Sequence, residues 1–179
     1  MKKLLLILLA LCLTHAVGAQ TRPHWLQISN KAVKDIRNYG VKGDGVTDDY
    51  DALKDAFEDG GLIVIPEGLT ILVDAPDTAV DQIDITKDTH IVNLGSTIKQ
   101  TATGSAYAFN VLGFTLDATN LSLTLENLVI DGQNAAHRGI YIDHNDYLGG
   151  VVKVSGCRIS NMNGADRVLS SSGVGVYGQ

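Results

Sequence analysis

The chain has 179 residues and a formal net charge of −6 at pH 7, a balance that does not attract the phosphates of nucleic acids, so we expect no nucleic-acid partner. Aspartate outnumbers glutamate by 17 to 3, and there are 19 glycines. Because Asp and Gly favour turns whereas Glu favours helices, the composition excludes a mainly helical protein and predicts strands and turns.

Residues 1–19 have the features of a secretory signal peptide. Lys2 and Lys3 precede the apolar run Leu4–Leu13, and small residues lead to a cleavage point near Ala19/Gln20. The apolar run is too short to cross a bilayer, so no membrane span is expected. Cleavage would leave a secreted or periplasmic protein that begins at Gln20 and is long enough for one domain with a core.

The next segment, residues 20–37, is expected to be a polar lead-in, with Ala32–Ile36 as a candidate first strand. The loop Asn38–Asp49 then holds three glycines and three aspartates within a short stretch, which predicts a tight loop and not a strand. Asp44, Asp48 and Asp49 could be read as a cation site, but turn and cap geometry accounts for all three, and no metal ligand is assigned.

A helix is expected near residues 48–58, with Thr47 or Asp48 as its N-cap. Its apolar residues share one face at spacings of three and four, namely Leu53, Ala56 and Phe57. Gly60-Gly61 should end the helix, and Leu62–Ile65 should form a short buried strand.

The loop Tyr-Gly-Val-Lys-Gly-Asp-Gly-Val-Thr-Asp-Asp, the helix and the strand ending in Ile-Pro-Glu-Gly together resemble the start of the pectate lyase superfamily, in particular its rhamnogalacturonase/epimerase-like branch. The resemblance covers residues 38–68. It implies an all-β, right-handed parallel β-helix (a pectin-lyase-like solenoid) with an N-terminal capping α-helix. It also implies action on pectin-like or other complex polysaccharide by lyase or glycoside hydrolase chemistry. Calcium is implied as a cofactor by the resemblance alone.

From Thr70 onward the chain consists of short β-branched runs separated by Gly, Asn and Asp. The segment Leu123–Asn134 aligns without gaps with Val152–Asn163. The matched pairs are Leu125/Val154, Leu128/Cys157, Ile130/Ile159 and Asn134/Asn163; looser copies are Ile91–Ile98 and the pair Gly139–Ile142 and Gly173–Val176. Recurring short strands predict stacked coils.

A β-sandwich is the alternative all-β fold, because Asp131-Gly132 and Asn163-Gly164 are dipeptides typical of hairpin turns. Each follows one of the equivalent strands, which favours corners of stacked coils. Few coils fit after residue 70, and the chain ends just after a strand. We therefore expect residues 38–179 to be the cap and first coils of a truncated β-helix.

The candidate site residues lie around the strand Gly139–Ile142. Asp143 and Asp146 are candidates for a catalytic acid/base pair, although polar residues after a strand also suit an exposed turn. Arg138 is a candidate partner for a sugar carboxylate, and Tyr147 for stacking on a sugar ring.

The resemblance itself supplies no catalytic residue, because the later acidic pairs, the Gly-His-Gly and the Arg-x-Lys of polygalacturonase-like chains are absent. Enzymatic activity is therefore expected of a longer parent protein. Two alternatives stay open: a non-catalytic carbohydrate-binding or adhesive β-helix, and a phage-tailspike-like protein, which would not need a signal peptide.

Overall fold

Short apolar runs form the strands of three sheets, and their side chains alternate between a buried and a more exposed face. The computed structural model describes residues 32–74, 82–101, 108–116, 121–144, 151–162 and 169–172, all within the unit Ala32–Gln179. The predicted signal peptide and its cleavage point lie outside these residues.

Each sheet is named here by its strands in the order in which they pair. Sheet A contains β1 (Val33–Asp35), β3 (Gly61–Ile65), β6 (Thr89–Asn93), β9 (Ser122–Glu126) and β12 (Val151–Ser155). Sheet B contains β2 (Asp44–Asp48), β4 (Thr70–Val73), β7 (Thr97–Gln100), β10 (Val129–Asp131) and β13 (Arg158–Ser160). Sheet C contains β5 (Ile83–Ile85), β8 (Ala108–Leu116), β11 (Ala136–His144) and β14 (Leu169–Ser172).

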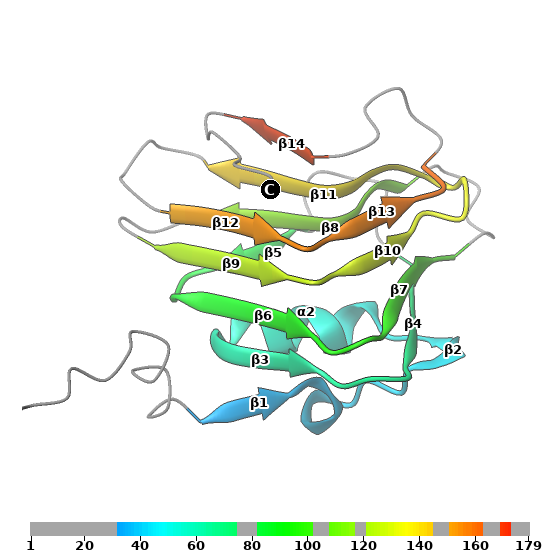
Figure 1. The fold of residues 1–179 in the computed structure, drawn as a ribbon, viewed down its shortest axis with the longest axis horizontal. Helices are drawn as coiled ribbons and strands as arrows, with labels where there is room; N and C mark the ends of the chain where they lie inside the picture. The colour runs from blue at the N-terminus through cyan, green and yellow to red at the C-terminus, as the bar shows by residue number, and fades with distance from the viewer. Residues whose placement is uncertain are drawn as a thin grey trace, which may run out of the picture. The chain divides into compact units, whose positions relative to one another are not determined.

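The chain visits the three sheets in cyclic order, so each turn adds one strand to sheet A, then sheet B, then sheet C (Figure 1). In the first turn the helix α2 (Tyr50–Glu58) stands where a strand of sheet C would be, and it contacts β5. All pairing among the described strands is parallel, which rules out the hairpin-built sandwich. The protein is mainly β, with parallel sheets and few helical residues, as a parallel β-helix or related solenoid requires.

The strand register confirms the predicted repeat. Leu125 pairs with Val154 and Ile130 pairs with Ile159, as the alignment of the two segments predicts. Asn163 and the predicted strand Gly173–Val176 lie outside the described residues. The described partner of β11 in the last turn is β14, in which Leu169 pairs with Ile140.

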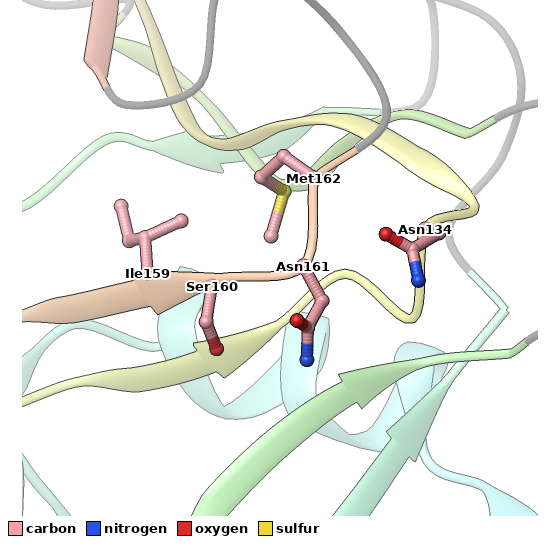
Figure 2. Close-up of a pocket in the computed structure, with 5 residues that line it drawn as sticks. All are labelled: Asn134, Ile159, Ser160, Asn161 and Met162. Carbon is pink, nitrogen blue, oxygen red and sulfur yellow. The ribbon is translucent and has the colours of Figure 1, made fainter.

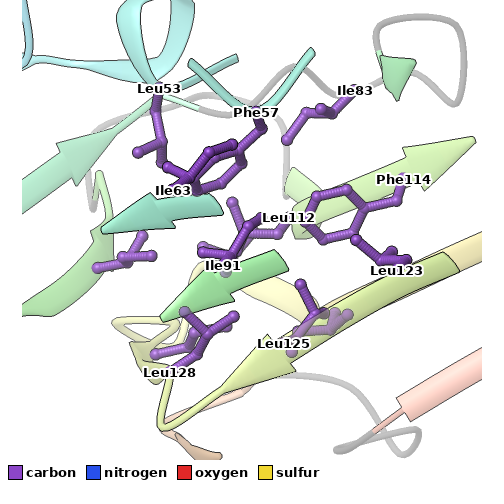
Figure 3. Close-up of a cluster of buried hydrophobic side chains, with 14 of the residues drawn as sticks. Leu53, Phe57, Ile63, Ile83, Ile91, Leu112, Phe114, Leu123, Leu125 and Leu128 are labelled. Atoms are coloured by element: carbon purple, nitrogen blue, oxygen red, sulfur yellow. The ribbon is translucent and has the colours of Figure 1, made fainter. Parts of the chain in front are cut away.

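The core fills the space between the three sheets and is almost wholly aliphatic. Figure 3 shows Leu53 and Phe57 of α2 pointing toward side chains of the sheets, among them Ile63 and Leu112. Phe57 lies 6.1 Å from Phe114 between ring centroids, at an interplanar angle of 31°. The helix thus covers the edge of sheet C at β5 with the apolar face that its sequence predicts.

The prediction that the glycine-rich loop contains no strand is wrong. Its second half forms β2, which pairs with β4 at the two ends of the strand, between Asp44 and Thr70 and between Asp48 and Leu72. The register shifts between these pairs, and Gly45 has a φ of +75°. A bulged strand at the edge of a sheet tolerates turn-forming residues that an inner strand would not, because it pairs on one side alone.

The predicted helix is confirmed, but its N-cap was misplaced. The cap residue is Asp49, whose side chain makes no capping bond and instead accepts hydrogen bonds from the backbone N–H groups of Lys42 (2.7 Å) and Gly43 (2.8 Å). Asp48 accepts the bond from the N–H of Tyr50 at 3.0 Å. Both carboxylates thus accept hydrogen bonds from the loop or the first helical turn. Asp44 likewise accepts bonds from Val46 and Thr47. The interpretation of all three aspartates as turn and cap residues is therefore confirmed.

Asp59, the C-cap residue of α2, is the centre of a charged cluster. It accepts hydrogen bonds from Lys34 Nζ and from the hydroxyl of Tyr39, each at 2.5 Å, and Lys87 Nζ lies 3.6 Å from the carboxylate. The hydrogen bond from Lys34, followed by that from Tyr39, lowers the pKa of Asp59 to about 2. The bond to Asp59 raises the pKa of Tyr39 to about 12.

These two shifts predict how stability changes with pH. The Asp59 contribution is complete above the ordinary pKa of 3.8 and is lost as the pH falls toward about 2, whereas the Tyr39 contribution is complete below pH 10.0 and is lost as the pH rises toward about 12. We expect Asp59→Asn to flatten the acid limb of a plot of urea midpoint against pH, and Tyr39→Phe to flatten the alkaline limb. Profiles parallel to that of the unmodified chain would contradict this assignment.

Candidate functional site

The outer face of sheet C carries the main concentration of polar side chains near the predicted site. On β11, Arg138, Tyr141 and Asp143 are partly exposed, whereas Ile140 and Ile142 are buried. We call these three partly exposed residues the β11 strip. The prediction placed Arg138 between two strands and Asp143 after a strand, but both lie within β11, which is longer than expected because Ala136–His144 pairs along β8.

A break in alternation explains why all three side chains face outward. Gly139 and Ile140 are consecutive buried residues, and Val111 and Leu112 of the neighbouring strand repeat the pattern. Two inward residues in succession shift the phase of the strand, so positions 138 and 141 both lie outside. The register then sets Asn110 beside Arg138, Gly113 beside Tyr141 and Thr115 beside Asp143.

The contacts on this face are polar, and one buried acceptor on it lacks a hydrogen-bond partner among the described residues. The Arg138 guanidinium lies over the Tyr141 ring, 5.2 Å from its centroid, a cation–π arrangement that holds both groups. The hydroxyl of Thr115 donates to Gln82 Oε1 at 2.7 Å. Asn110 Oδ1 is buried and has no hydrogen-bond partner within the part of the chain that the structure describes. Such an acceptor costs free energy unless a ligand or water group satisfies it.

A row of oxygen-bearing side chains crosses the strands at the Asp143 end of the β11 strip. Asp84 of β5, Thr115 of β8 and Asp143 of β11 share one register position. The N–H of Asp84 donates to Glu58 Oε1 at 3.0 Å, so the row continues to the end of helix α2. Sequence reasoning missed Asp84, Asn110 and Thr115, because these residues join the site through strand register and not through chain proximity.

The structure therefore brings two of the four predicted site residues, Arg138 and Asp143, onto one strand face. Asp146 and Tyr147 lie outside the described residues. What the strip offers chemically is a cation, an aromatic ring and a carboxylate on one face of a single strand.

A pocket of about 310 Å³ lies at the corner between sheets B and C. Figure 2 shows its lining, which comes from the corner after β10 and from β13 and the residues that follow it: Asn134, Ile159, Ser160, Asn161 and Met162. These five described residues offer amides, a hydroxyl and apolar surface, and none of them is an acid, base or thiol. The pocket can bind a polar group, and these five side chains supply no catalytic chemistry.

Asp131, next to this pocket, has a structural role, as the sequence predicts. Burial alone would raise its pKa, but hydrogen bonds from Asn161 and Gln133, with the charge of Lys99, lower the pKa overall. Asn161 Nδ2 donates at 2.8 Å and Gln133 Nε2 at 2.5 Å. The carboxylate is thus ionised and occupied by the turn that it closes.

Calcium, implied by the resemblance, does not fit the described residues. Asp44, Asp48, Asp49 and Asp131 already accept bonds from N–H donors, so their oxygens face groups that a cation would repel. No cluster of three or more His, Cys, Asp or Glu able to hold a metal occurs within the described ranges.

Outside these sites, Glu126 on the outer face of sheet A lies 3.3 Å from His90 Nε2 and 3.9 Å from Lys153 Nζ. Glu126 thus faces side chains from both neighbouring strands, since His90 and Lys153 each share a register position with Thr124. Cys157 packs against the core, and burial raises the pKa of its thiol, so it is not an activated nucleophile.

Comparison with known proteins bears on the fold and not on the function. No family model matches the chain. A 57-residue stretch is 39% identical to part of a protein named non-secreted LysM effector LysM19 from Penicillium expansum, covering 30% of this chain and 4% of that protein. The structure of ORF18 of Geobacillus virus E2 matches with a TM-score of 0.55 and 24% sequence identity, covering 77% of this chain and 27% of that one.

The chain therefore spans a small part of each of these longer proteins, and the likeness to the virus protein concerns the fold alone. Among the described residues, no helix is both long enough and apolar enough to cross a membrane.

Proposed function

We propose that this chain forms a secreted right-handed parallel β-helix of the pectate-lyase type, and that it binds a complex polysaccharide across the outer face of sheet C. The cyclic A–B–C order of the strands and the helix in place of the first sheet C strand support the fold assignment. The loop, helix and strand of residues 38–68 support the family assignment.

The observation that carries the functional part is the β11 strip. A guanidinium held over an aromatic ring presents fixed donors beside an apolar ring surface, and Asp143 adds a carboxylate acceptor on the same strand face. Sugars offer both hydroxyl groups and apolar C–H faces, so this combination suits them. Asn110 Oδ1 lies beside Arg138 at the register position that faces it, and it is buried without a hydrogen-bond partner in the described part of the chain.

Two chemical steps are compatible with the strip. Hydrolysis needs one carboxylic acid near the leaving oxygen and a second carboxylate, and elimination needs a base beside the sugar ring. Asp143 is the carboxylate of the strip, and in either reaction it would be the acid or base. A β-helix that binds glycans without turnover is the second candidate, and it uses the same face.

The experiment measures both binding and turnover. Pectic and non-pectic oligosaccharides are titrated into the purified chain by calorimetry, while unsaturated products and reducing ends are followed in parallel. We expect Arg138→Ala to weaken binding of the bound glycan about tenfold, or about 1.4 kcal/mol. Arg158→Ala, which removes an exposed guanidinium from the outer face of sheet B, is the matched control and should leave the affinity unchanged.

Asp143→Asn separates the two candidates. If the chain is catalytic, this variant should still bind the glycan, because the amide oxygen of Asn also accepts hydrogen bonds, and it should lose turnover. If the chain only binds, the unmodified protein should give no product from any glycan that it binds. Equal weakening by Arg138→Ala and Arg158→Ala would contradict the placement of the glycan on sheet C. Absence of binding across the whole panel would overturn the proposed function.

A further inference from the structure

We infer that the corner pocket between sheets B and C is a second glycan subsite, which takes one uncharged sugar ring by hydrogen bonds to Asn134 and Asn161. The inference rests on the proposed function, because it names the sugar class that one part of the polysaccharide must contain. It concerns residues separate from the β11 strip, so the two can be tested independently.

The amide of Asn134 is available for a ligand. Its side chain is exposed and makes no hydrogen bond within the part of the chain described here, although its backbone N–H donates to the carbonyl of Asn161 at 2.7 Å. The two residues have φ values of +57° and +55°, so the corner holds both in the same left-handed conformation. Figure 2 shows both amides at the pocket.

The carboxylate of Asp131 orients the side-chain amide of Asn161. Its Nδ2 donates to Asp131 Oδ1 at 2.8 Å, which fixes the amide and leaves its carbonyl oxygen as an acceptor. Asn134 contributes a donor and an acceptor of its own. A donor and two acceptors at one corner match neighbouring hydroxyl groups, which both donate and accept.

The apolar part of the lining comes from Ile159 and Met162. Met162 is 8% exposed and lies against Gly132, where an added Cβ would come within 2.5 Å of Met162 Cε. Ile159 lies in the same way against Gly139, with a corresponding distance of 2.5 Å to Cγ2. Because Gly132 and Gly139 have no side chains, Met162 and Ile159 can pack closely against the preceding turn of the chain. The part of these two side chains that lines the pocket suits the C–H face of a sugar ring.

The charge and size of the pocket define the sugar class. None of the lining residues in the described part of the chain has an ionisable side chain, and the neighbouring carboxylate of Asp131 is occupied by Asn161 and Gln133. A uronate would gain no ion pair with these lining residues and would lie near the negative charge of Asp131, whereas a neutral sugar would meet no such repulsion. A volume of about 310 Å³ is at the lower end of ligand pockets, which suits one ring and not a longer segment.

The test uses methyl glycosides of neutral sugars (glucose, galactose, mannose, rhamnose and N-acetylglucosamine) and of galacturonate and glucuronate as probes. Side-chain amide signals of the ¹⁵N-labelled chain are followed by NMR during titration. We expect at least one neutral glycoside to shift the Asn134 and Asn161 amide signals, with an affinity that does not change with salt. Neither uronate should shift them at the same concentration.

Asn134→Ala should weaken this binding about tenfold. Asn127→Ala is the matched control, because Asn127 is an exposed corner asparagine with a φ of +58° and lies at the A–B corner, outside the pocket lining. The backbone effect of the substitution is thus the same in both variants. Equal loss in the two, or shifts caused by the uronates as strongly as by the neutral glycosides, would overturn the inference.

The outcomes also separate this inference from the proposed function. If oligosaccharide binding depends on Arg138 but no glycoside shifts the Asn134 signal, the subsite is wrong and the proposed function stands. If a neutral glycoside binds at Asn134 while Arg138→Ala leaves oligosaccharide binding intact, the subsite stands and the glycan does not cross sheet C.

Discussion

Asn93→Asp is expected to destabilise the protein by about 3–5 kcal/mol, because it places a carboxylate against two carbonyl oxygens inside the A–B corner. Asn93 is 3% exposed, and its Nδ2 donates to the carbonyls of Ser96 and Asn127, each at 2.9 Å. Its Oδ1 accepts from the N–H of Ser96 at 2.9 Å. The replacement keeps the acceptor and turns both donated bonds into contacts between oxygens.

The Asn93 network also joins successive turns. Ser96 Oγ accepts from the N–H of Leu69 at 2.8 Å and donates to the carbonyl of Pro66, so residues of three turns meet at this corner. We therefore expect the loss to appear as a lower urea midpoint of the whole unit.

Asn127→Asp makes the same chemical change at an exposed position of the same corner and should alter the free energy of unfolding by less than about 0.5 kcal/mol. The Asn93→Asp penalty should shrink as the pH is lowered toward about 4, because a protonated carboxyl can donate one bond. A loss no larger than that of Asn127→Asp would show that Asn93 does not hold the corner.

Asp49→Ala is expected to cost about 2–4 kcal/mol, since it removes two hydrogen bonds to a charged acceptor and leaves their donors unpaired. Asp49 is 2% exposed and binds the N–H groups of Lys42 and Gly43. Its backbone N–H also donates to the carbonyl of Leu72 at 2.8 Å, and its carbonyl accepts from Leu53 at 2.9 Å. One residue thus ties the loop, the helix and sheet B together.

Urea unfolding measures the Asp49→Ala loss, and hydrogen exchange at Lys42 and Gly43 locates it. Asp51→Ala, an exposed aspartate in the first turn of the same helix, is the control and should cost less than about 1 kcal/mol through the helix dipole. Unchanged exchange at Lys42 and Gly43 in Asp49→Ala would contradict the role assigned to this carboxylate.

The sequence predicted those parts of the fold that depend on local patterns. Gly60-Gly61 ends the helix where expected, since both residues have positive φ, and Leu62–Ile65 is a strand. The alignment of the two repeated segments gave the pairing of β9 with β12 and of β10 with β13 in the correct register. Apolar spacing and turn residues suffice there because each strand buries one face against the same core.

The predictions failed where tertiary contacts override local preference. Asp44–Asp48 forms a strand because β4 offers it a free edge, and the carboxylate of Asp49 turns away from its helix because loop N–H groups need an acceptor. The candidate site was found in part, because Arg138 and Asp143 share one chain segment. Asp84 and Asn110 belong to earlier turns of the chain, and only the stacking of β5, β8 and β11 brings them to the same face.

The most direct test of the account is to map the glycan on the folded chain by backbone NMR. The ¹⁵N-labelled protein is titrated with the glycan of highest affinity from the calorimetric panel. We predict that the largest shift changes fall on outward residues of β8 and β11, with Arg138, Tyr141 and Asp143 among them. Changes confined to the outer faces of sheets A and B would contradict the central claim that sheet C is the glycan-binding face.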